Sequence, residues 1–217
     1  MIIGLNGLIG SGKGAASDYL QTKHNFQHLS FADSLKHAVS AIFGWSFEML
    51  KGATPESRAW REQIDPWWAN RLNIPDLTPR WILQQWGTEV GRRSFHPDIW
   101  VAALENKIVN SIGDFVIDDC RFANEMDIIR KNNGALVRIN RGALPEWYGT
   151  ALSQLSLQNV YGNDPDYVDV MATKYPDVHV SEWGWVNQPF NYEVENNGTL
   201  KELHAKLDEI VETEATK

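Results

Sequence analysis

A glycine-rich loop follows an apolar run at the start of this sequence, and together they limit the possible folds of the chain. Residues 1–5 read MIIGL, which is typical of a buried strand, and residues 7–13 read GLIGSGK, which matches G-x-x-x-x-G-K. Behind the lysine, residues suited to a buried helix face recur at helical spacing, namely Ala15, Ala16, Tyr19 and Leu20. The order of strand, glycine loop, lysine and helix predicts a phosphate-binding loop, or P-loop.

The chemistry of phosphate binding explains these residue types. Glycines let successive backbone N–H groups curl around an anion, and a side chain there would block its approach. The N-terminus of the helix adds a partial positive charge, and Lys13 adds a full one. A glycine turn with a solvated Lys13 is the alternative, but the preceding strand favours phosphate binding.

The residues behind the lysine depart from the usual pattern. A serine or threonine normally follows the lysine, and its hydroxyl binds Mg²⁺. Here Gly14 and then Ala15 occupy those positions. The sequence therefore predicts a nucleotide site but leaves the protein ligand of the metal open, with Ser11 and Ser17 as candidates to replace the missing hydroxyl.

The composition narrows the class of protein. With 217 residues, of which 43% are apolar, the chain suits one α/β domain with a substantial core. Its net charge of −8 argues against binding to nucleic acid. No apolar run approaches the roughly twenty residues of a membrane span, and Met1 leads straight into a strand, so we expect no signal peptide. Cys120 is the only cysteine, which excludes an intrachain disulfide and favours a reducing, cytoplasmic location.

A group of carboxylates follows a buried-type strand in the middle of the chain, where residues 115–119 read FVIDD. In a P-loop fold a carboxylate at this strand end approaches Mg²⁺, directly or through water, so we predict a metal-binding role for Asp119. A polar strand end without a ligand is the alternative. Cys120 is interpreted as a small packing residue. Arg121 would stand at the carboxyl edge of the sheet, where ligands lie in open α/β folds.

Periodicity predicts alternating strands and helices along the rest of the chain. We expect further strands at residues 26–31, 135–140 and 192–195. Helices are expected to begin near Ala32, Thr78, Pro97, Arg121 and Thr199. Gly87 or Gly91 is expected to interrupt the second of these helices, and Gly134 to cap the fourth. The alternation predicts a mainly parallel sheet flanked by helices.

Two stretches are less regular. Residues 45–77 show little periodicity and hold several of the ten tryptophans, which we interpret as core or cleft walls rather than as stacking platforms for nucleic acid. Residues 142–190 are too long for a plain loop in a compact domain and are interpreted as a lid or an inserted subdomain.

In their order these motifs resemble those of the bacteriophage deoxynucleoside monophosphate kinases, a branch of the P-loop nucleoside-monophosphate kinases. The matching stretches span nearly the whole chain: 7–13 (GLIGSGK), 31–36 (FADSLK), 83–92 (LQQWGTEVGR), 97–101 (PDIWV), 119–125 (DCRFANE), 179–182 (HVSE) and 195–200 (ENNGTL). The resemblance implies a P-loop NTPase fold in one kinase domain, with residues 45–95 as the segment that binds the nucleoside monophosphate.

The resemblance also implies an activity, the transfer of the γ-phosphoryl group of ATP to a deoxynucleoside 5′-monophosphate with Mg²⁺. The ATP-binding residues that it implies are Gly7, Gly10, Ser11, Gly12, Lys13, Gly14 and, near the adenine, Asn196. The monophosphate would lie among Asp33, Lys36, Arg92, Trp100, Arg121 and Glu125. Lys13, Arg121 and Asp119 would act in catalysis. For Asp33, a plain first-turn helix charge is the alternative.

One departure concerns the positive charge at the transferring phosphoryl group. Nucleoside-monophosphate kinases often bring arginines there on the lid, but residues 142–190 hold a single basic residue, Lys174. Arg121, Arg138 and Arg141 would then have to supply that charge.

Two other functions stay open at this point. One is a kinase similar to dephospho-coenzyme A kinase, whose acceptor is a ribose hydroxyl, and the other is a nucleotide-binding module without catalysis. The sequence also leaves open which bases are accepted and the oligomeric state, with a homodimer among the candidates.

Overall fold

The structure is a computed structural model of the chain, and it describes residues 1–161 and 169–217. The chain forms two compact units, one made of Met1–Leu29 together with Gly113–Lys217 and the other of Ser30–Ile112. The first unit holds the sheet, and the second is built from helices.

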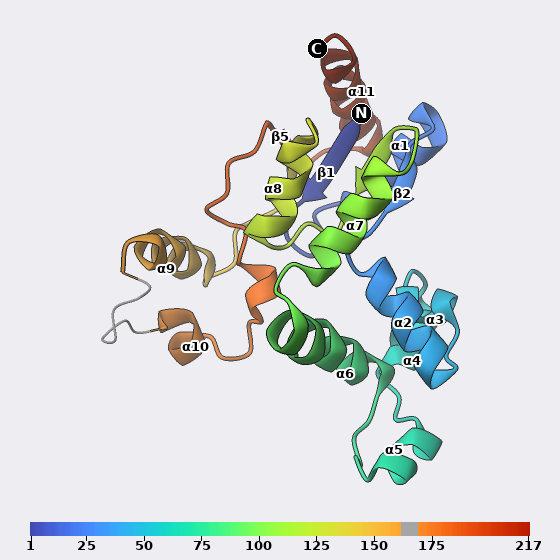
Figure 1. Ribbon diagram of the computed structural model, residues 1–217. Coiled ribbons are helices and arrows are strands. Elements are labelled where there is room, and N and C mark those ends of the chain that lie inside the picture. Colours follow the sequence, from blue (N-terminus) through green and yellow to red (C-terminus); the bar gives the residue numbers. More distant parts are fainter. Residues whose placement is uncertain (162–168) are drawn as a thin grey trace. The chain divides into compact units, whose positions relative to one another are not determined.

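The first unit is organised around a five-stranded sheet (Figure 1). Its strands are β1 (Ile2–Asn6), β2 (Gln27–Leu29), β3 (Phe115–Ile117), β4 (Ala135–Asn140) and β5 (Tyr192–Glu195). They run parallel in the order β2-β3-β1-β4-β5, with β1 at the centre. Because the carboxyl ends of parallel strands meet at one edge, the segments that follow these strands gather there. With the glycine loop behind β1, this is the predicted P-loop NTPase fold.

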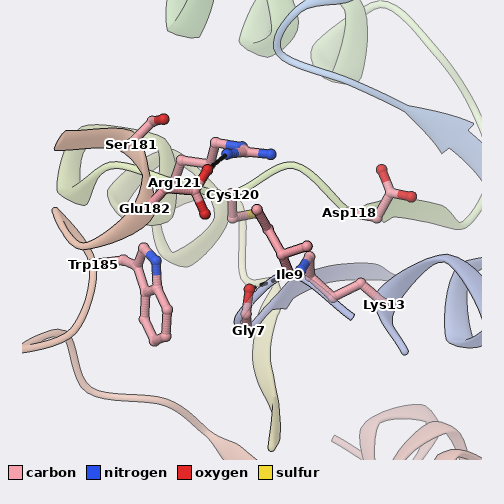
Figure 2. A pocket seen from close by; sticks show the side chains of 9 residues that line it. All are labelled: Gly7, Ile9, Lys13, Asp118, Cys120, Arg121, Ser181, Glu182 and Trp185. Carbon is pink, nitrogen blue, oxygen red and sulfur yellow. Dashed lines mark hydrogen bonds and ion pairs between the residues drawn. The ribbon is translucent and has the colours of Figure 1, made fainter. Parts of the chain in front are cut away.

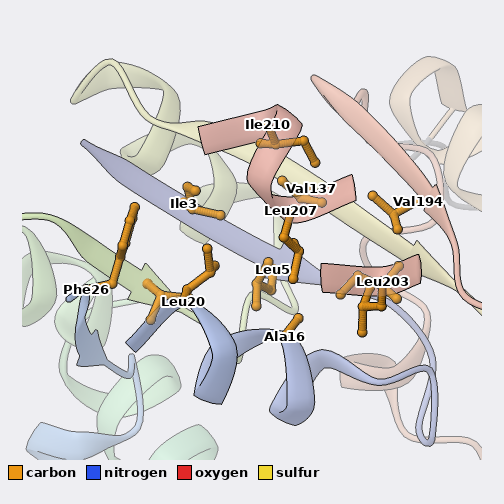
Figure 3. Close-up of a cluster of buried hydrophobic side chains, with 12 residues drawn as sticks. Ile3, Leu5, Ala16, Leu20, Phe26, Val137, Val194, Leu203, Leu207 and Ile210 are labelled. Atoms are coloured by element: carbon orange, nitrogen blue, oxygen red, sulfur yellow. The ribbon is translucent and has the colours of Figure 1, made fainter. Parts of the chain in front are cut away.

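Helices cover both faces of this sheet. One face is covered by α1 (Lys13–His24) and α11 (Leu200–Ala215), and the other by α8 (Ala123–Lys131). The unit also contains α9 (Tyr148–Tyr161), α10 (Val170–Lys174) and the 3₁₀ helix η2 (Val180–Glu182). Successive side chains of a strand point to opposite faces, so Ile3 and Leu5 of β1 share one face and Gly4 lies on the other. Ile3 and Leu5 pack in one core with α1 and with Leu207 of α11 (Figure 3). Gly4 lies against Ile129 of α8, which leaves no room for a Cβ.

The second unit is a cluster of short helices around an apolar core. They are α2 (Asp33–Phe43), α3 (Phe47–Lys51), α4 (Pro55–Arg61), α5 (Pro66–Leu72), α6 (Pro79–Gln84), the π-helix η1 (Gln85–Phe95) and α7 (Ile99–Val109). The core consists of Leu35, Val39, Phe43, Trp45, Leu50, Ala69, Leu77 and Ile82. Partly buried tryptophans pack against it, namely Trp60, Trp68, Trp81, Trp86 and Trp100. The interpretation of the tryptophans as packing residues is confirmed for these positions.

Three helices of the second unit begin with the same local signal. Thr54, Asp65 and Thr78 each accept a backbone N–H of the first turn, and a proline follows each of them. Such side chains satisfy N–H groups that a helix start leaves unpaired, and proline suits the first helical position. The sequence predicts the start at Thr78. Residues 45–77 carry the same signal twice, but the helices there are too short for their periodicity to show.

One expectation about helix ends was wrong. The helix from Thr78 changes from α to π before it reaches either Gly87 or Gly91, so neither glycine interrupts it. At the end of α8, Gly134 donates its N–H to the carbonyl oxygen of Ile129 at 2.8 Å and so caps the helix, while the left-handed residue is Asn133, with a φ of 54°.

The stretch 142–190 contains α9, α10 and η2, and its residues 162–168 lie outside the part that the structure describes. A role of this stretch as a lid or insertion stays a prediction, as does the binding segment at 45–95. Among the described residues, none of the helices has the length and apolar character needed to cross a membrane.

Candidate functional site

The glycine loop connects β1 to α1 at the carboxyl edge of the sheet. Gly7 has a φ of 147°, and a Cβ there would collide with the carbonyl oxygen of Ile139. Gly12 has a φ of 107°, and a Cβ there would collide with the side-chain amide of Asn196. Both positions require glycine for conformation and for space. The loop shape is therefore fixed by neighbours on β4 and behind β5, which lie far away in the sequence.

Lys13 is the first residue of α1 and lies over this loop. Its Nζ donates to the carbonyl oxygens of Gly7 at 2.7 Å and Leu8 at 2.9 Å. Burial lowers the pKa of Lys13, and the charge of Arg121 lowers it further, while nearby carboxylates act in the opposite direction. The ammonium is thus a partly desolvated cation at the N-terminus of a helix, where an anion would be strongly attracted.

Lys13 and Arg121 line one pocket (Figure 2). The residues around it are Gly7, Ile9, Lys13, Asp118, Cys120, Arg121, Ser181, Glu182 and Trp185. They come from the glycine loop, from the segment behind β3 and from the segment at η2. The pocket therefore combines two cations with two carboxylates and the backbone of the predicted phosphate loop.

The Arg121 side chain has an ionic partner in this pocket. Its Nη1 donates to Oε1 of Glu182 at 2.8 Å. The Glu125 carboxylate, which is buried, accepts the backbone N–H groups of Arg121 at 2.7 Å and of Phe122 at 3.1 Å. Glu125 thus fixes the backbone that carries Arg121, and its predicted contact with the substrate stays a prediction.

Of the two adjacent carboxylates behind β3, the one that lines the pocket is Asp118 rather than Asp119. Asp118 lies directly behind β3, and its Oδ1 is 2.9 Å from Nε2 of His28. Asp119 is not among the described residues that line this pocket, so its predicted roles in catalysis and metal binding stay predictions. Sequence reasoning chose between two adjacent carboxylates and had no means to tell which one faces Lys13.

The hydroxyl groups proposed as substitutes for the missing metal ligand are both buried. The Ser11 hydroxyl lies beside Gly7 and has no hydrogen-bond partner among the described residues. The Ser17 hydroxyl receives a hydrogen bond from the Gln21 amide at 3.2 Å. The described residues contain no group of three or more metal-binding side chains. Mg²⁺ bound with a nucleotide needs only one or two carboxylates beside the phosphates, and Asp118 offers that chemistry.

Asn196, which was predicted to lie near the adenine, contacts the glycine loop. Its Nδ2 donates to the carbonyl oxygen of Ser11 at 2.8 Å, and the side chain is buried. Its backbone N–H donates to the backbone carbonyl oxygen of Asn140 at 2.7 Å, which continues the pairing of β5 with β4.

The other predicted substrate-binding residues belong to the second unit. Asp33 and Lys36 lie in the first turn of α2 with 3.7 Å between their charged atoms. Trp100 donates its indole N–H to the carbonyl oxygen of Gly87 at 2.9 Å and packs against Gly91. Arg92 lies on the same π-helix as these two glycines. The second unit therefore pairs Asp33 with Lys36 and uses Trp100 to hold the helix that carries Arg92.

Comparison with known proteins identifies the family. No protein-family model matches the chain. A protein of Acanthamoeba polyphaga mimivirus, provisionally named a deoxynucleotide monophosphate kinase, is 32% identical over 178 residues, which cover 76% of this chain and 86% of the relative. This chain belongs to the deoxynucleotide monophosphate kinase family. The deoxynucleoside-5′-monophosphate kinase of Escherichia phage T5 is 43% identical over 58 residues, or 26% of this kinase and 23% of the phage enzyme.

Solved structures align with this kinase only at low similarity. Shikimate kinase from Aquifex aeolicus aligns over 100% of this chain and 99% of its own length, with 12% identity and a TM-score of 0.46. Dephospho-CoA kinase from Campylobacter jejuni aligns over 97% and 95%, with 15% identity and a TM-score of 0.43. Neither alignment adds to the fold assignment, which rests on the sheet order and the glycine loop of this kinase.

Sequence reasoning missed part of the pocket of this kinase. Glu182 and Trp185 line it from a stretch in which no periodicity is readable. The signal that could have found Glu182 is its place in HVSE, a stretch that belongs to the family resemblance. Trp185 gives no comparable signal, because an isolated tryptophan is typical of packing as well as of ligand binding.

Proposed function

We propose that this kinase transfers the γ-phosphoryl group of ATP to the 5′-phosphate of a deoxynucleoside monophosphate, giving the diphosphate and ADP. The observation that carries the proposal is that Lys13 and Arg121 line one pocket at the end of the glycine loop. The family supports the class of acceptor, since both relatives are named for it.

On the donor side, the glycine loop would hold the phosphates of ATP. The residues proposed for this role are Gly7, Gly10, Ser11, Gly12, Lys13 and Gly14. Lys13 now donates to two carbonyl oxygens of the loop. A phosphate oxygen carries negative charge and is a stronger acceptor than a carbonyl oxygen. We therefore expect the ammonium to leave these carbonyl groups for the phosphates when ATP binds.

Transfer itself needs alignment and neutralised charge rather than a covalent intermediate. The planar guanidinium of Arg121 fits two oxygens of a phosphate at once. Glu182, its present partner, would be exchanged for the acceptor phosphate, since both are anions. Burial raises the pKa of the Cys120 thiol well above its usual value. This thiol therefore stays protonated and is a poor nucleophile, which fits direct transfer.

On the acceptor side, we propose that the second unit binds the nucleotide with Asp33, Lys36, Arg92 and Trp100. Lys36 and Arg92 supply positive charge for the monophosphate. The Asp33 carboxylate lies close to Lys36 and therefore close to the proposed position of the monophosphate. There it could accept hydrogen bonds from the sugar or base.

Magnesium is the proposed metal cofactor. When bound, it would neutralise the developing charge on the phosphates of ATP. The carboxylates of Asp118 and Asp119 are the hard oxygen donors that it prefers. Both relatives come from viruses. We therefore propose the cytoplasm of an infected host cell as the place of the reaction.

A coupled assay of ADP release tests the proposal. We expect release that depends on a deoxynucleoside monophosphate, with each of the bases offered in turn and with ribonucleotides for comparison. Release that depends on dephospho-coenzyme A instead would assign the chain to the other kinase class. Tight ATP binding without any release that depends on an acceptor would indicate a non-catalytic module.

A further inference from the structure

We infer that Asn196 is a positioning residue that sets the phosphate-binding loop in its active shape, and that it does not recognise adenine. The inference rests on the proposed function in one respect, because it takes the loop to be the site of the triphosphate. It gives Asn196 a role different from the one implied by the family resemblance, which places this residue near the adenine of ATP.

The contact that supports the inference is buried. Nδ2 of Asn196 donates to the carbonyl oxygen of Ser11 at 2.8 Å. Asn196 is 6% exposed and Ser11 is 1% exposed. A buried hydrogen bond between an amide and a backbone carbonyl is costly to lose, because the partner left behind can no longer reach water.

Because a peptide unit is planar, the bond to the Ser11 carbonyl also fixes the direction of the Gly12 N–H. The structure has no cis peptide bonds among its described residues, so the peptide between Ser11 and Gly12 is trans. In a trans peptide the C=O and N–H bonds point in opposite directions. Holding the Ser11 carbonyl at Asn196 therefore directs the Gly12 N–H away from Asn196. A loop that binds an anion needs this separation, with N–H groups toward the ligand and carbonyl oxygens away from it.

The loop needs this hydrogen bond because the peptide between Ser11 and Gly12 could otherwise rotate easily. A peptide that precedes glycine can rotate by half a turn at little steric cost, since glycine adopts positive and negative φ about equally. Such a rotation would exchange N–H for C=O and would present a carbonyl oxygen to the phosphates. The Asn196 amide opposes this rotation. After it, the Gly12 N–H would face the Asn196 Nδ2 in place of the Ser11 carbonyl oxygen, and two donors cannot form a hydrogen bond.

A second observation points to the same pair of segments. A Cβ on Gly12 would collide with Nδ2 of Asn196. The glycine before Lys13 therefore serves the close approach of the asparagine as well as that of the phosphate. The loop and the turn behind β5 fit each other closely at this point.

The turn that carries Asn196 is itself firmly placed. The Glu202 carboxylate accepts the Thr199 N–H at 2.8 Å, and the Thr199 hydroxyl accepts the Glu202 N–H at 3.3 Å, which caps α11. Lys206 donates to the carbonyl oxygen of Glu195 at 2.5 Å. Asn196 thus acts from a rigid base, which a positioning residue needs.

The experiment compares Asn196→Ala and Asn196→Asp with the unaltered chain. Aspartate keeps the shape of asparagine but replaces the donor with an acceptor, so it remains informative if the alanine variant fails to fold. Calorimetry measures the Kd of ATP, of GTP and of inorganic tripolyphosphate, which has no base. Asn132→Ala is the matched control, because the Asn132 amide also donates to a backbone carbonyl oxygen, that of Ile128 at 2.9 Å, but behind α8.

A positioning role predicts that both Asn196 variants weaken all three ligands by a similar factor, on the order of tenfold. It also predicts a higher KM for ATP with an unchanged KM for the deoxynucleoside monophosphate, and no such change in the Asn132 control. Weaker ATP binding with unchanged tripolyphosphate binding would show that Asn196 recognises the base and would overturn the inference. Unchanged binding of all three would overturn it as well. If the unaltered chain binds none of the three ligands, the proposed phosphate site itself is wrong, and with it the proposed function.

Discussion

The two compact units of this kinase differ in what holds their proposed ligand residues in place. In Met1–Leu29 with Gly113–Lys217, the phosphate loop is fixed by backbone conformation and by a bond from the segment behind β5, in which Asn196 donates to the Ser11 carbonyl oxygen. In Ser30–Ile112, the candidate residues lie on α2, η1 and α7, and these helices are held by packing around tryptophans.

This difference indicates how substitutions should act. A loop that is set by backbone geometry can lose a functional side chain and keep its shape, so changes there should affect turnover with little effect on stability. A helix cluster that is set by packing should lose stability and acceptor binding together when a packing residue changes. Four experiments test this difference between the two units.

The largest effect is expected for Lys13→Ala. The lysine supplies the full positive charge of the donor site, and loss of a cation that acts mainly in the transition state should lower kcat on the order of 10³-fold. The Tm should change little, because among the described residues the Nζ bonds carbonyl groups of its own loop, those of Gly7 and Leu8. Steady-state kinetics measures kcat, and thermal unfolding measures the Tm. A variant with near-normal kcat would contradict the role of Lys13 in phosphoryl transfer.

The next effect is expected for Arg121→Lys. Lysine keeps the charge but loses the planar fork, and we expect kcat to fall on the order of 10²-fold. Arg130→Lys is the control, because Arg130 also forms an ion pair, at 2.8 Å with Asp127, but on the exposed side of α8. Equal rates for the Arg121 variant and the unaltered chain would make Arg121 a structural residue.

A smaller effect is expected for the two carboxylates behind β3. Asp118→Asn should raise the Mg²⁺ concentration needed for half-maximal activity by about tenfold, because Asp118 lines the pocket with Lys13. Asp119→Asn should have the smaller effect. Titration of activity with Mg²⁺ measures both, and a larger shift for Asp119→Asn would favour the assignment made from the sequence.

These cases show how far the sequence could predict this kinase. The P-loop fold and the loop itself could be predicted, because the glycine pattern, the lysine and the strand–helix order are local signals whose physics needs no tertiary context. Lys13 and Arg121 are predicted from motifs behind β1 and β3, and the structure brings them to one pocket, while their roles stay predictions.

The rest depends on contacts between residues far apart in the sequence. The choice between Asp118 and Asp119 depends on which way one residue turns as it leaves β3. The ionic partner of Arg121 comes from Glu182, 61 positions away. The short helices of the second unit depend on packing of their tryptophans, which no periodicity within five to seven residues can reveal.

The smallest effect, and the direct test of the second unit, is expected for Trp100→Phe. Phenylalanine keeps an aromatic ring but loses the indole N–H that donates to Gly87 at 2.9 Å, so the free energy of unfolding should fall by about 1 kcal/mol. Since Arg92 lies on the same π-helix, the KM for the deoxynucleoside monophosphate should rise several-fold while the KM for ATP stays constant. Trp67→Phe is the control, because Trp67 is 62% exposed and its change should alter stability by less than about 0.5 kcal/mol. A Trp100 variant that loses stability but keeps its KM for the acceptor would separate packing from binding, and the second unit would then lose its proposed role.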